Sequence, residues 1–164
     1  MLGTGVRIGE ALALAWDLVD LDVAEVTIAY TLIRVKGQGL MRKSTKTDNG
    51  MRTIPLSPLL VAMLRRRRRT IGQTPVFPAE LGGWRDPYNI QRDLRNARGE
   101  FAWVSFHTFR KTAATVLDEA GLSARDIANI LGHSRISMTQ DTYLGRGAVD
   151  QRAAEVLAAS ICGE

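Results

Sequence analysis

The stretch EVTIAYTLIR, residues 25–34, has the alternation that decides the fold class of this chain. Apolar or aromatic residues recur at every second position from Val26 to Leu32, which predicts a β-strand with one buried face. Further short strands and turns follow: strands at residues 40–44 and 52–55, and turns at Gly37-Gln38-Gly39 and Asp48-Asn49-Gly50. The sequence therefore predicts a small three-stranded antiparallel sheet.

The remainder of the chain reads as helices with short breaks. A helix over residues 6–16 and a turn over residues 17–22 precede the sheet. After the sheet, Ser57-Pro58 and Asp86-Pro87 combine a capping side chain with a proline at the first helical position. Helices are expected to begin at Pro58 and to span residues 88–98, 107–120, 123–131, 137–143 and 149–159, with Gly121 and Gly132 as C-terminal caps. The fold class is α+β, mostly helical.

Length and composition restrict the function classes. With 164 residues and 45% hydrophobic content, the chain is expected to be one globular domain. It has neither an apolar run of about 18 residues nor a signal-peptide pattern, so a cytoplasmic protein with no membrane partner is predicted. The single cysteine, Cys162, has no second cysteine for a disulfide or a metal site, and no cofactor is expected.

The basic balance indicates a polyanionic partner. The net charge is +5 and the sequence pI is near 9.9, which favours binding to phosphate groups. Residues 65–69 are five consecutive arginines, and on a helix they point in every direction. A solvated helix end explains this run best, and a share in a DNA-facing surface stays open.

Two arginines and two histidines occur in short motifs that suit phosphodiester chemistry. His107 and Arg110 share one face of a helix start, with Ser105 as the expected N-cap. Arg7 precedes Glu10 by three residues, so the carboxylate can orient the guanidinium. His133 follows Leu131-Gly132. Taken singly, each motif is better explained by capping or by a surface ion pair.

Cleavage of DNA by side chains needs fixed cations, a nucleophile and a proton donor. Arginines stabilise the extra negative charge of the transition state at phosphorus. Tyr143 is the candidate nucleophile, although nearby cations or a base must activate it because a tyrosine has an ordinary pKa of about 10. Lys46, in the hairpin after the second strand, is the candidate proton donor, and Lys43 competes with it.

The ordered set of motifs resembles the catalytic domain of the tyrosine recombinase (phage integrase) family. The matching pieces are Thr4-Gly5-Val6-Arg7-Ile8-Gly9-Glu10, Thr45-Lys46-Thr47, His107-Thr108-Phe109-Arg110, Leu131-Gly132-His133-Ser134 and Asp141-Thr142-Tyr143. Lys111 stands where many members carry another histidine. The resemblance covers almost the whole chain. It implies that residues 1–164 are the catalytic domain, without the N-terminal DNA-binding domain and the first catalytic-domain helices, since Met1 lies only six residues before Arg7.

The resemblance implies a role for each motif residue. Arg7 and Arg110 would clamp the scissile phosphate, and His133 would hydrogen-bond it. Lys46 would protonate the leaving 5′ oxygen, with His107 as the accessory acid or base. Tyr143 would form a 3′-phosphotyrosyl bond, which a 5′ hydroxyl of another strand attacks, so that strands are exchanged without a metal or ATP.

The resemblance also implies partners and leaves alternatives. Duplex DNA would be bound by a homotetramer whose C-terminal helix, residues 149–159, packs on a neighbouring protomer. Three alternatives remain open: a type IB topoisomerase, a truncated DNA-binding fragment without catalysis, and a basic helical protein whose motifs are coincidental.

Overall fold

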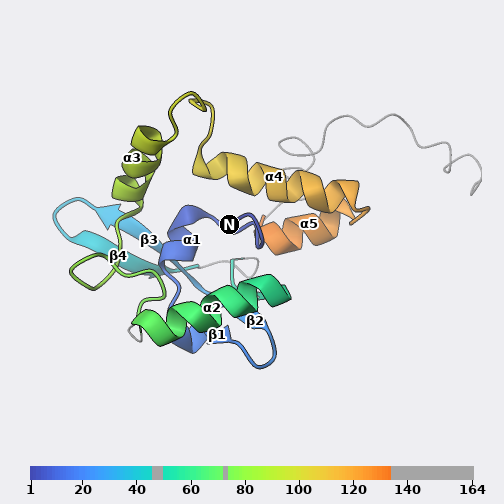
Figure 1. Cartoon of the computed structure of the whole chain (residues 1–164), viewed down its shortest axis with the longest axis horizontal. Helices are drawn as coiled ribbons and strands as arrows, with labels where there is room; N and C mark the ends of the chain where they lie inside the picture. The colour runs from blue at the N-terminus through green and yellow to red at the C-terminus, as the bar shows by residue number, and fades with distance from the viewer. Residues whose placement is uncertain (46–49, 72–73, 134–164) are drawn as a thin grey trace, which may run out of the picture.

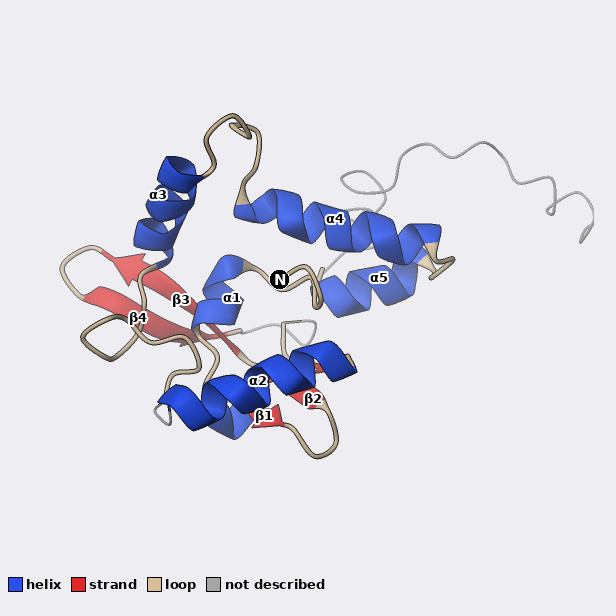
Figure 2. Cartoon of the chain, viewed as in Figure 1, coloured by secondary structure: helices blue, strands red, loops and turns tan. Residues whose placement is uncertain are grey.

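The computed structural model describes residues 1–45, 50–71 and 74–133, and its strands form two small antiparallel sheets among helices (Figure 2). The three-stranded sheet has the order β1-β2-β5, made of β1 (Val19–Asp20), β2 (Glu25–Ile28) and β5 (Arg52–Pro55). A separate hairpin pairs β3 (Tyr30–Val35) with β4 (Gly39–Ser44). The expected α+β class is confirmed.

The single strand expected over residues 25–34 is wrong, because the chain divides at Ala29 into β2 and β3. The Ala29 carbonyl accepts from the backbone N and Oγ1 of Thr45, at 2.9 and 3.1 Å. On one side of this point β2 pairs with β5, and on the other β3 pairs with β4. Each half therefore has its own partner strand, and the three-stranded sheet is not the one that the alternation predicted.

The segment before the sheet also differs from the prediction. The helix expected over residues 6–16 shortens to α1 (Ile8–Leu12). Beyond α1 the backbone becomes extended at Ala15, with φ −116° and ψ 157°, which ends the helix, and the Leu14 carbonyl accepts from the Val76 backbone at 2.9 Å. The turn expected over residues 17–22 contains part of a 3₁₀ helix, η1 (Trp16–Leu18), and β1.

The later helices within the described residues begin where the capping residues predict. Asp86 accepts a hydrogen bond from the Tyr88 backbone at 2.9 Å, and Ser105 accepts one from the Thr108 backbone at 3.2 Å. The four helices are α2 (Pro58–Ile71), α3 (Pro87–Ala97), α4 (Phe106–Glu119) and α5 (Ala124–Leu131). The helices expected at residues 137–143 and 149–159 lie outside the described residues.

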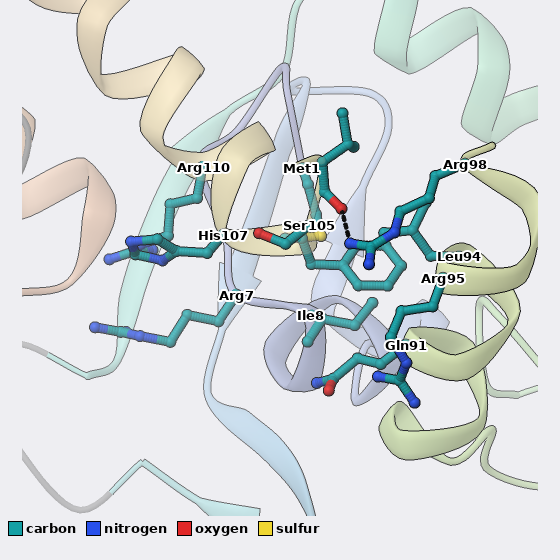
Figure 3. A pocket seen from close by; sticks show the side chains of 12 residues that line it. Met1, Arg7, Ile8, Gln91, Leu94, Arg95, Arg98, Ser105, His107 and Arg110 are labelled. Atoms are coloured by element: carbon teal, nitrogen blue, oxygen red, sulfur yellow. Dashed lines mark hydrogen bonds between the residues drawn. The ribbon is translucent and has the colours of Figure 1, made fainter. Parts of the chain in front are cut away.

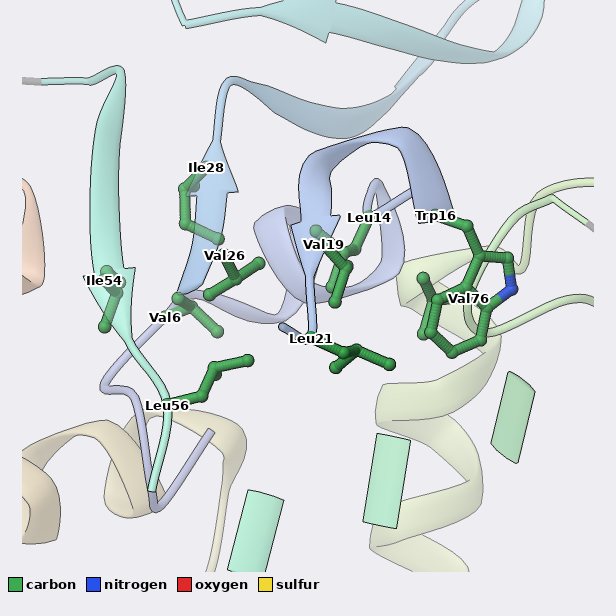
Figure 4. Packing of buried hydrophobic residues seen from close by; sticks show 10 residues of the cluster. All are labelled: Val6, Leu14, Trp16, Val19, Leu21, Val26, Ile28, Ile54, Leu56 and Val76. Carbon is green, nitrogen blue, oxygen red and sulfur yellow. The ribbon is translucent and has the colours of Figure 1, made fainter. Parts of the chain in front are cut away.

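The largest apolar core lies between the three-stranded sheet, η1 and the extended segment after α1 (Figure 4). Its buried residues are Val6, Leu14, Trp16, Val19, Leu21, Val26, Ile28, Ile54, Leu56 and Val76. Side chains of α2, among them Leu60 and Leu64, pack against this cluster. The core therefore anchors the N-terminal segment that carries Arg7.

Helices α4 and α5 lie side by side and share a smaller cluster around Ala114, Ile127 and Leu131 (Figure 1). Figure 1 shows α1 at the centre, with α3 and the β3–β4 hairpin on one side and the α4–α5 pair on the other. In this arrangement the start of α1, the start of α4 and the end of α5 approach one another.

Within the described residues no helix is both long and apolar enough to cross a membrane.

Candidate active site

Arg7 stands at the entrance to α1 and is fixed by Glu10. The Glu10 carboxylate accepts from the backbone N of Arg7 and from its Nη1, both at 2.9 Å. The Arg7 side chain remains 44% exposed, whereas that of Glu10 is 3% exposed. Gly5, just upstream, has φ +64°, and a Cβ there would lie 2.5 Å from the Leu131 side chain. The glycine thus lets the Arg7 segment run against the end of α5.

Arg110, in the first turns of α4, is buried and hydrogen-bonds to segments on both sides. Its Nη1 donates to the Gly5 carbonyl at 2.6 Å, and its Nη2 donates to the Leu131 carbonyl at 2.7 Å. The same Nη2 lies 2.7 Å from Nε2 of His133. The residue is 2% exposed, so its planar fork has a fixed direction.

His133 follows the left-handed Gly132 that ends α5, and it is 4% exposed. A guanidinium only donates hydrogen bonds, so Nε2 of His133 accepts from Arg110 and the ring proton lies on Nδ1. Burial, together with the charges of Arg110, Arg7 and Arg52, lowers the pKa of His133 to about 4. His133 is therefore a neutral imidazole near neutral pH.

Arg52 of β5 belongs to the same cluster, and no sequence motif predicted it. Its Nη2 lies 2.9 Å from Oε2 of Glu10, its Nε donates to the Ile130 carbonyl at 2.7 Å, and its side chain is 8% exposed. The two-residue repeat of a strand could have predicted its burial. Arg52 lies two residues before the buried Ile54, and such positions share one face of a strand. An arginine on a buried strand face requires a partner.

Three successive carbonyls at the end of α5 accept hydrogen bonds from three different arginines. The carbonyls of residues 130, 131 and 132 accept from Arg52, Arg110 and Arg7 respectively, the last at 3.5 Å from both terminal nitrogens. The last carbonyls of a helix lack partners within it, and they carry the negative end of the helix dipole. We refer to Arg7, Arg52 and Arg110 as the arginine collar. It joins α1, β5 and α4 to the end of α5.

The collar is electrostatically positive. Burial alone would raise the pKa of Glu10, but Arg52, Arg7 and the Arg7 backbone outweigh it and hold that pKa below its ordinary value. Three guanidiniums with one carboxylate and a neutral imidazole give three positive charges and one negative, a net +2. Such a site favours an anion with several oxygens.

A cavity of about 340 Å³ opens beside the collar (Figure 3). Arg7, His107 and Arg110 line one side, and Gln91, Arg95 and Arg98 of α3 and its C-terminal cap line another. His107 is exposed at the start of α4, as expected from its position beside Ser105. Arg98 donates to the Val104 carbonyl at 2.9 Å and so ties the end of α3 to the α3–α4 loop. Four of the expected site residues therefore lie at the collar and this cavity.

The remaining candidates are placed differently. Lys46 and Tyr143 lie outside the described residues, whereas the competing Lys43 is exposed on β4. Among residues 1–45, 50–71 and 74–133, no group of three His, Cys, Asp or Glu side chains could hold a metal ion.

The arginine run of α2 is partly anchored to the fold. Arg67 donates to the Val76 carbonyl at 2.6 Å, Arg68 lies over the Trp16 ring, and Arg65 donates to the Leu21 carbonyl at 3.0 Å. These three arginines fasten α2 to the core. Neither a solvated helix end nor a share in a DNA-facing surface, the two explanations that the sequence left for the run, describes them fully.

Comparison with known proteins identifies the relatives of the chain. Residues 1–146 match the phage integrase family. A "Tyrosine recombinase XerC-like" protein of Caldanaerobacter subterraneus subsp. tengcongensis is 30% identical over 166 residues, which cover 86% of this chain and 42% of that protein. A "Tyrosine recombinase XerC" of Xanthomonas campestris pv. campestris is 32% identical over 143 residues, 84% of this chain and 39% of that protein. The chain thus spans about two fifths of the length of these curated relatives.

Solved structures share the fold. The Tn1549 transposon integrase in complex with transposon right end DNA superposes with a TM-score of 0.77 at 24% identity, over 97% of this chain and 56% of that chain. The XerA recombinase gives a TM-score of 0.66 at 23% identity, over 99% of this chain and 56% of that chain. The architecture is therefore that of these recombinase and integrase structures.

Proposed function

The chain belongs to the phage integrase family, and we propose that residues 1–164 are the catalytic domain of a site-specific DNA recombinase. The domain would cleave and rejoin duplex DNA through a phosphotyrosine intermediate. The observation that supports this most is the arginine collar with its net positive charge, which places Arg7 and Arg110 beside one cavity. Two fixed guanidinium forks suit the non-bridging oxygens of a phosphodiester.

In the proposed cleavage step, the Tyr143 hydroxyl attacks the scissile phosphorus. A bond forms between the tyrosine oxygen and phosphorus, and the bond from phosphorus to the 5′ oxygen breaks. Lys46 donates a proton to that leaving oxygen, and His107, as the accessory acid or base, accepts the proton that the Tyr143 hydroxyl loses. Arg7 and Arg110 stabilise the added negative charge, and His133 hydrogen-bonds the phosphate as a neutral ring. A 5′ hydroxyl from another strand then reverses the step and frees Tyr143.

The family also supports proposals for the assembly. The partner would be duplex DNA, bound by four copies of the whole protein. The C-terminal segment at residues 149–159 would pack on a neighbouring copy, and the reaction would take place in the cytoplasm.

Covalent trapping tests the proposed chemistry. The chain is incubated with a pool of nicked duplexes of randomised sequence, in which loss of the short cleaved strand traps the intermediate. Denaturing gels then reveal protein–DNA adducts, and peptide mass spectrometry locates the modified residue. We expect adducts on Tyr143 in the wild type and none with Tyr143→Phe, while DNA affinity stays within about twofold because only one hydroxyl is removed.

The same assay separates the competing functions. Bound DNA without any adduct would overturn the catalytic proposal and favour a DNA-binding protein without catalysis. Adducts together with relaxation of supercoiled plasmid, but without joining of strands from two duplexes, would favour a topoisomerase. Equal adduct yield from Tyr143→Phe would refute the assigned nucleophile.

A further inference from the structure

Arg52 is the member of the collar that does not line the cavity. Arg7 and Arg110 both reach that space, whereas the Arg52 side chain is 8% exposed and contacts Glu10 and the end of α5. It is therefore placed to act on other residues of the site, and a phosphate in the cavity would not touch it.

We propose that Arg52 is a positioning residue of the recombinase reaction, which sets Arg7 through Glu10 and sets His133 through the Ile130 carbonyl. This inference rests on the proposed function and assigns the residue a task within that same site.

The first connection runs through one shared carboxylate. Oε2 of Glu10 accepts from the Arg7 backbone and from Nη2 of Arg52, both at 2.9 Å, while Oε1 accepts from Nη1 of Arg7 at 2.9 Å and lies 3.4 Å from Nη1 of Arg52. The two terminal nitrogens of Arg52 face the two oxygens and fix the plane of the carboxylate. Arg7 is 44% exposed, and this fixed carboxylate makes the shorter of its contacts, at 2.9 Å against 3.5 Å to the Gly132 carbonyl, so it is the main restraint on the guanidinium.

The second connection runs through the end of α5. Nε of Arg52 donates to the Ile130 carbonyl at 2.7 Å, in the last turn before Gly132 and His133. The His133 backbone in turn donates to the Ala128 carbonyl at 2.9 Å, which closes the helix. Arg52 thus holds from β5 the same helix end that presents His133 to Arg110.

Kinetics on the nicked duplexes test this role in the full chain. Arg52→Met removes the fork, and we expect adduct formation at saturating DNA to slow roughly 10²-fold, as for a misplacement of about 1 Å, with little change in the DNA concentration at half-saturation. Arg52→Lys keeps the charge and one donor, and it should recover part of the rate.

A double variant identifies the path of the effect. If Arg52 acts mainly through Glu10, the Arg52→Met change should cost several-fold less in a Glu10→Gln background than in the wild type. Independent, multiplying losses would contradict the connection from Arg52 to Arg7 through Glu10.

The pH profile supplies a readout that loss of folding does not mimic. Groups facing Glu10 and His133 are Arg7 from the N-terminal segment, Arg52 from β5 and Arg110 from α4. Without Arg52, burial persists while one positive charge is lost, so the pKa values of Glu10 and His133 both rise. The acidic limb of the adduct rate in Arg52→Met should therefore move to higher pH.

Arg67→Met is the matched control. Arg67 also gives Nε to a backbone carbonyl, that of Val76 at 2.6 Å, but on α2 and outside the collar. We expect a similar loss of melting temperature with a near wild-type adduct rate. An equal rate loss in both variants at equal melting temperature, or a wild-type rate in Arg52→Met, would overturn the positioning role. Absence of adducts in the wild type would instead overturn the proposed function.

Discussion

Two regions of the molecule hold partly or fully buried arginines, and they do so by different means. In the β3–β4 hairpin, Arg42 lies between two aromatic rings, 3.8 Å from the Tyr30 centroid and 4.9 Å from the Trp84 centroid, and its Nε donates to the Ala13 carbonyl at 3.0 Å. We call this arrangement the aromatic cage. At the end of α5, the collar instead gathers three arginines around one carboxylate and three carbonyls.

The difference lies in what compensates the charge. In the cage, one cation faces two neutral rings whose electron-rich faces attract it, so it is stabilised without a carboxylate partner in the described residues. In the collar, Glu10 is shared by two arginines and His133 stays neutral, which leaves an excess of positive charge beside a cavity. The cage is therefore suited to joining the hairpin to the segment after α1, and the collar to binding an anion.

The sharpest contrast is expected from the same substitution in the two regions. Arg110→Lys keeps the charge of the collar but removes the fork that contacts Gly5, Leu131 and His133. Adduct formation on nicked DNA should fall about 10²- to 10³-fold, the usual cost of losing one preorganised donor to a developing oxyanion. Quench-flow or gel time courses at saturating DNA measure it. A rate within threefold of the wild type would mean that the collar does not serve the transition state.

The burial of His133, together with the positive charges of the collar, also predicts how stability depends on pH. Folding lowers the pKa of His133 from an ordinary 6.5 to about 4, so between these values the unfolded chain binds more protons than the folded one. The contribution is fully present above pH 6.5 and is lost as the pH falls toward 4. The unfolding free energy should drop by about 2 kcal/mol between pH 7 and pH 5 from this residue.

Chemical denaturation of the wild type and of His133→Gln at pH 7 and pH 5 isolates the contribution of His133 to the unfolding free energy. The variant should show a smaller drop, because it lacks the titrating ring. An equal drop in both proteins would show that neither burial nor the nearby arginines disfavour the charged imidazole of His133.

Arg42→Lys in the cage is expected to lower stability and spare the adduct rate, whereas Arg110→Lys is expected to lower the adduct rate. A lysine loses the planar stacking on Tyr30 and Trp84, so the unfolding free energy should fall by about 1 kcal/mol. The adduct rate should stay within twofold of the wild type. Denaturation and trapping on one preparation provide both numbers, and a large loss of rate would place the cage in the functional site.

Local chemistry is what the sequence predicted well. The starts of α2, α3 and α4 follow from Ser57, Asp86 and Ser105, because a capping side chain and its backbone partner lie within three residues of each other. The helix expected from residue 123 begins at Ala124, with Ser123 as its N-cap. The division at Ala29 could not be read the same way. It depends on which strand pairs with each half, and those partners arrive later in the chain.

The site shows the same limit. The motifs around Arg7, Arg110 and His133 predicted the residues that meet, through the resemblance to a family whose members carry them in this order. No local motif predicted Arg52, because its partners Glu10 and Ile130 are 42 and 78 residues away in the sequence. Its buried strand face was the available signal, and an arginine on the same face as Ile54 can be sought in other sequences.

The smallest effect is expected from arginines that belong to neither region. Arg66 and Arg69 of α2 are exposed, unlike Arg42 of the cage and Arg110 of the collar. Changing both to glutamine should leave the melting temperature and the adduct rate unchanged. The dependence of DNA affinity on salt decides the question that the sequence left open, because each lost phosphate contact makes the negative slope of log K against log salt shallower by about 0.9. An unchanged slope assigns these two positions to a solvated helix face, whereas a slope shallower by about 1.8 would extend the DNA surface onto α2.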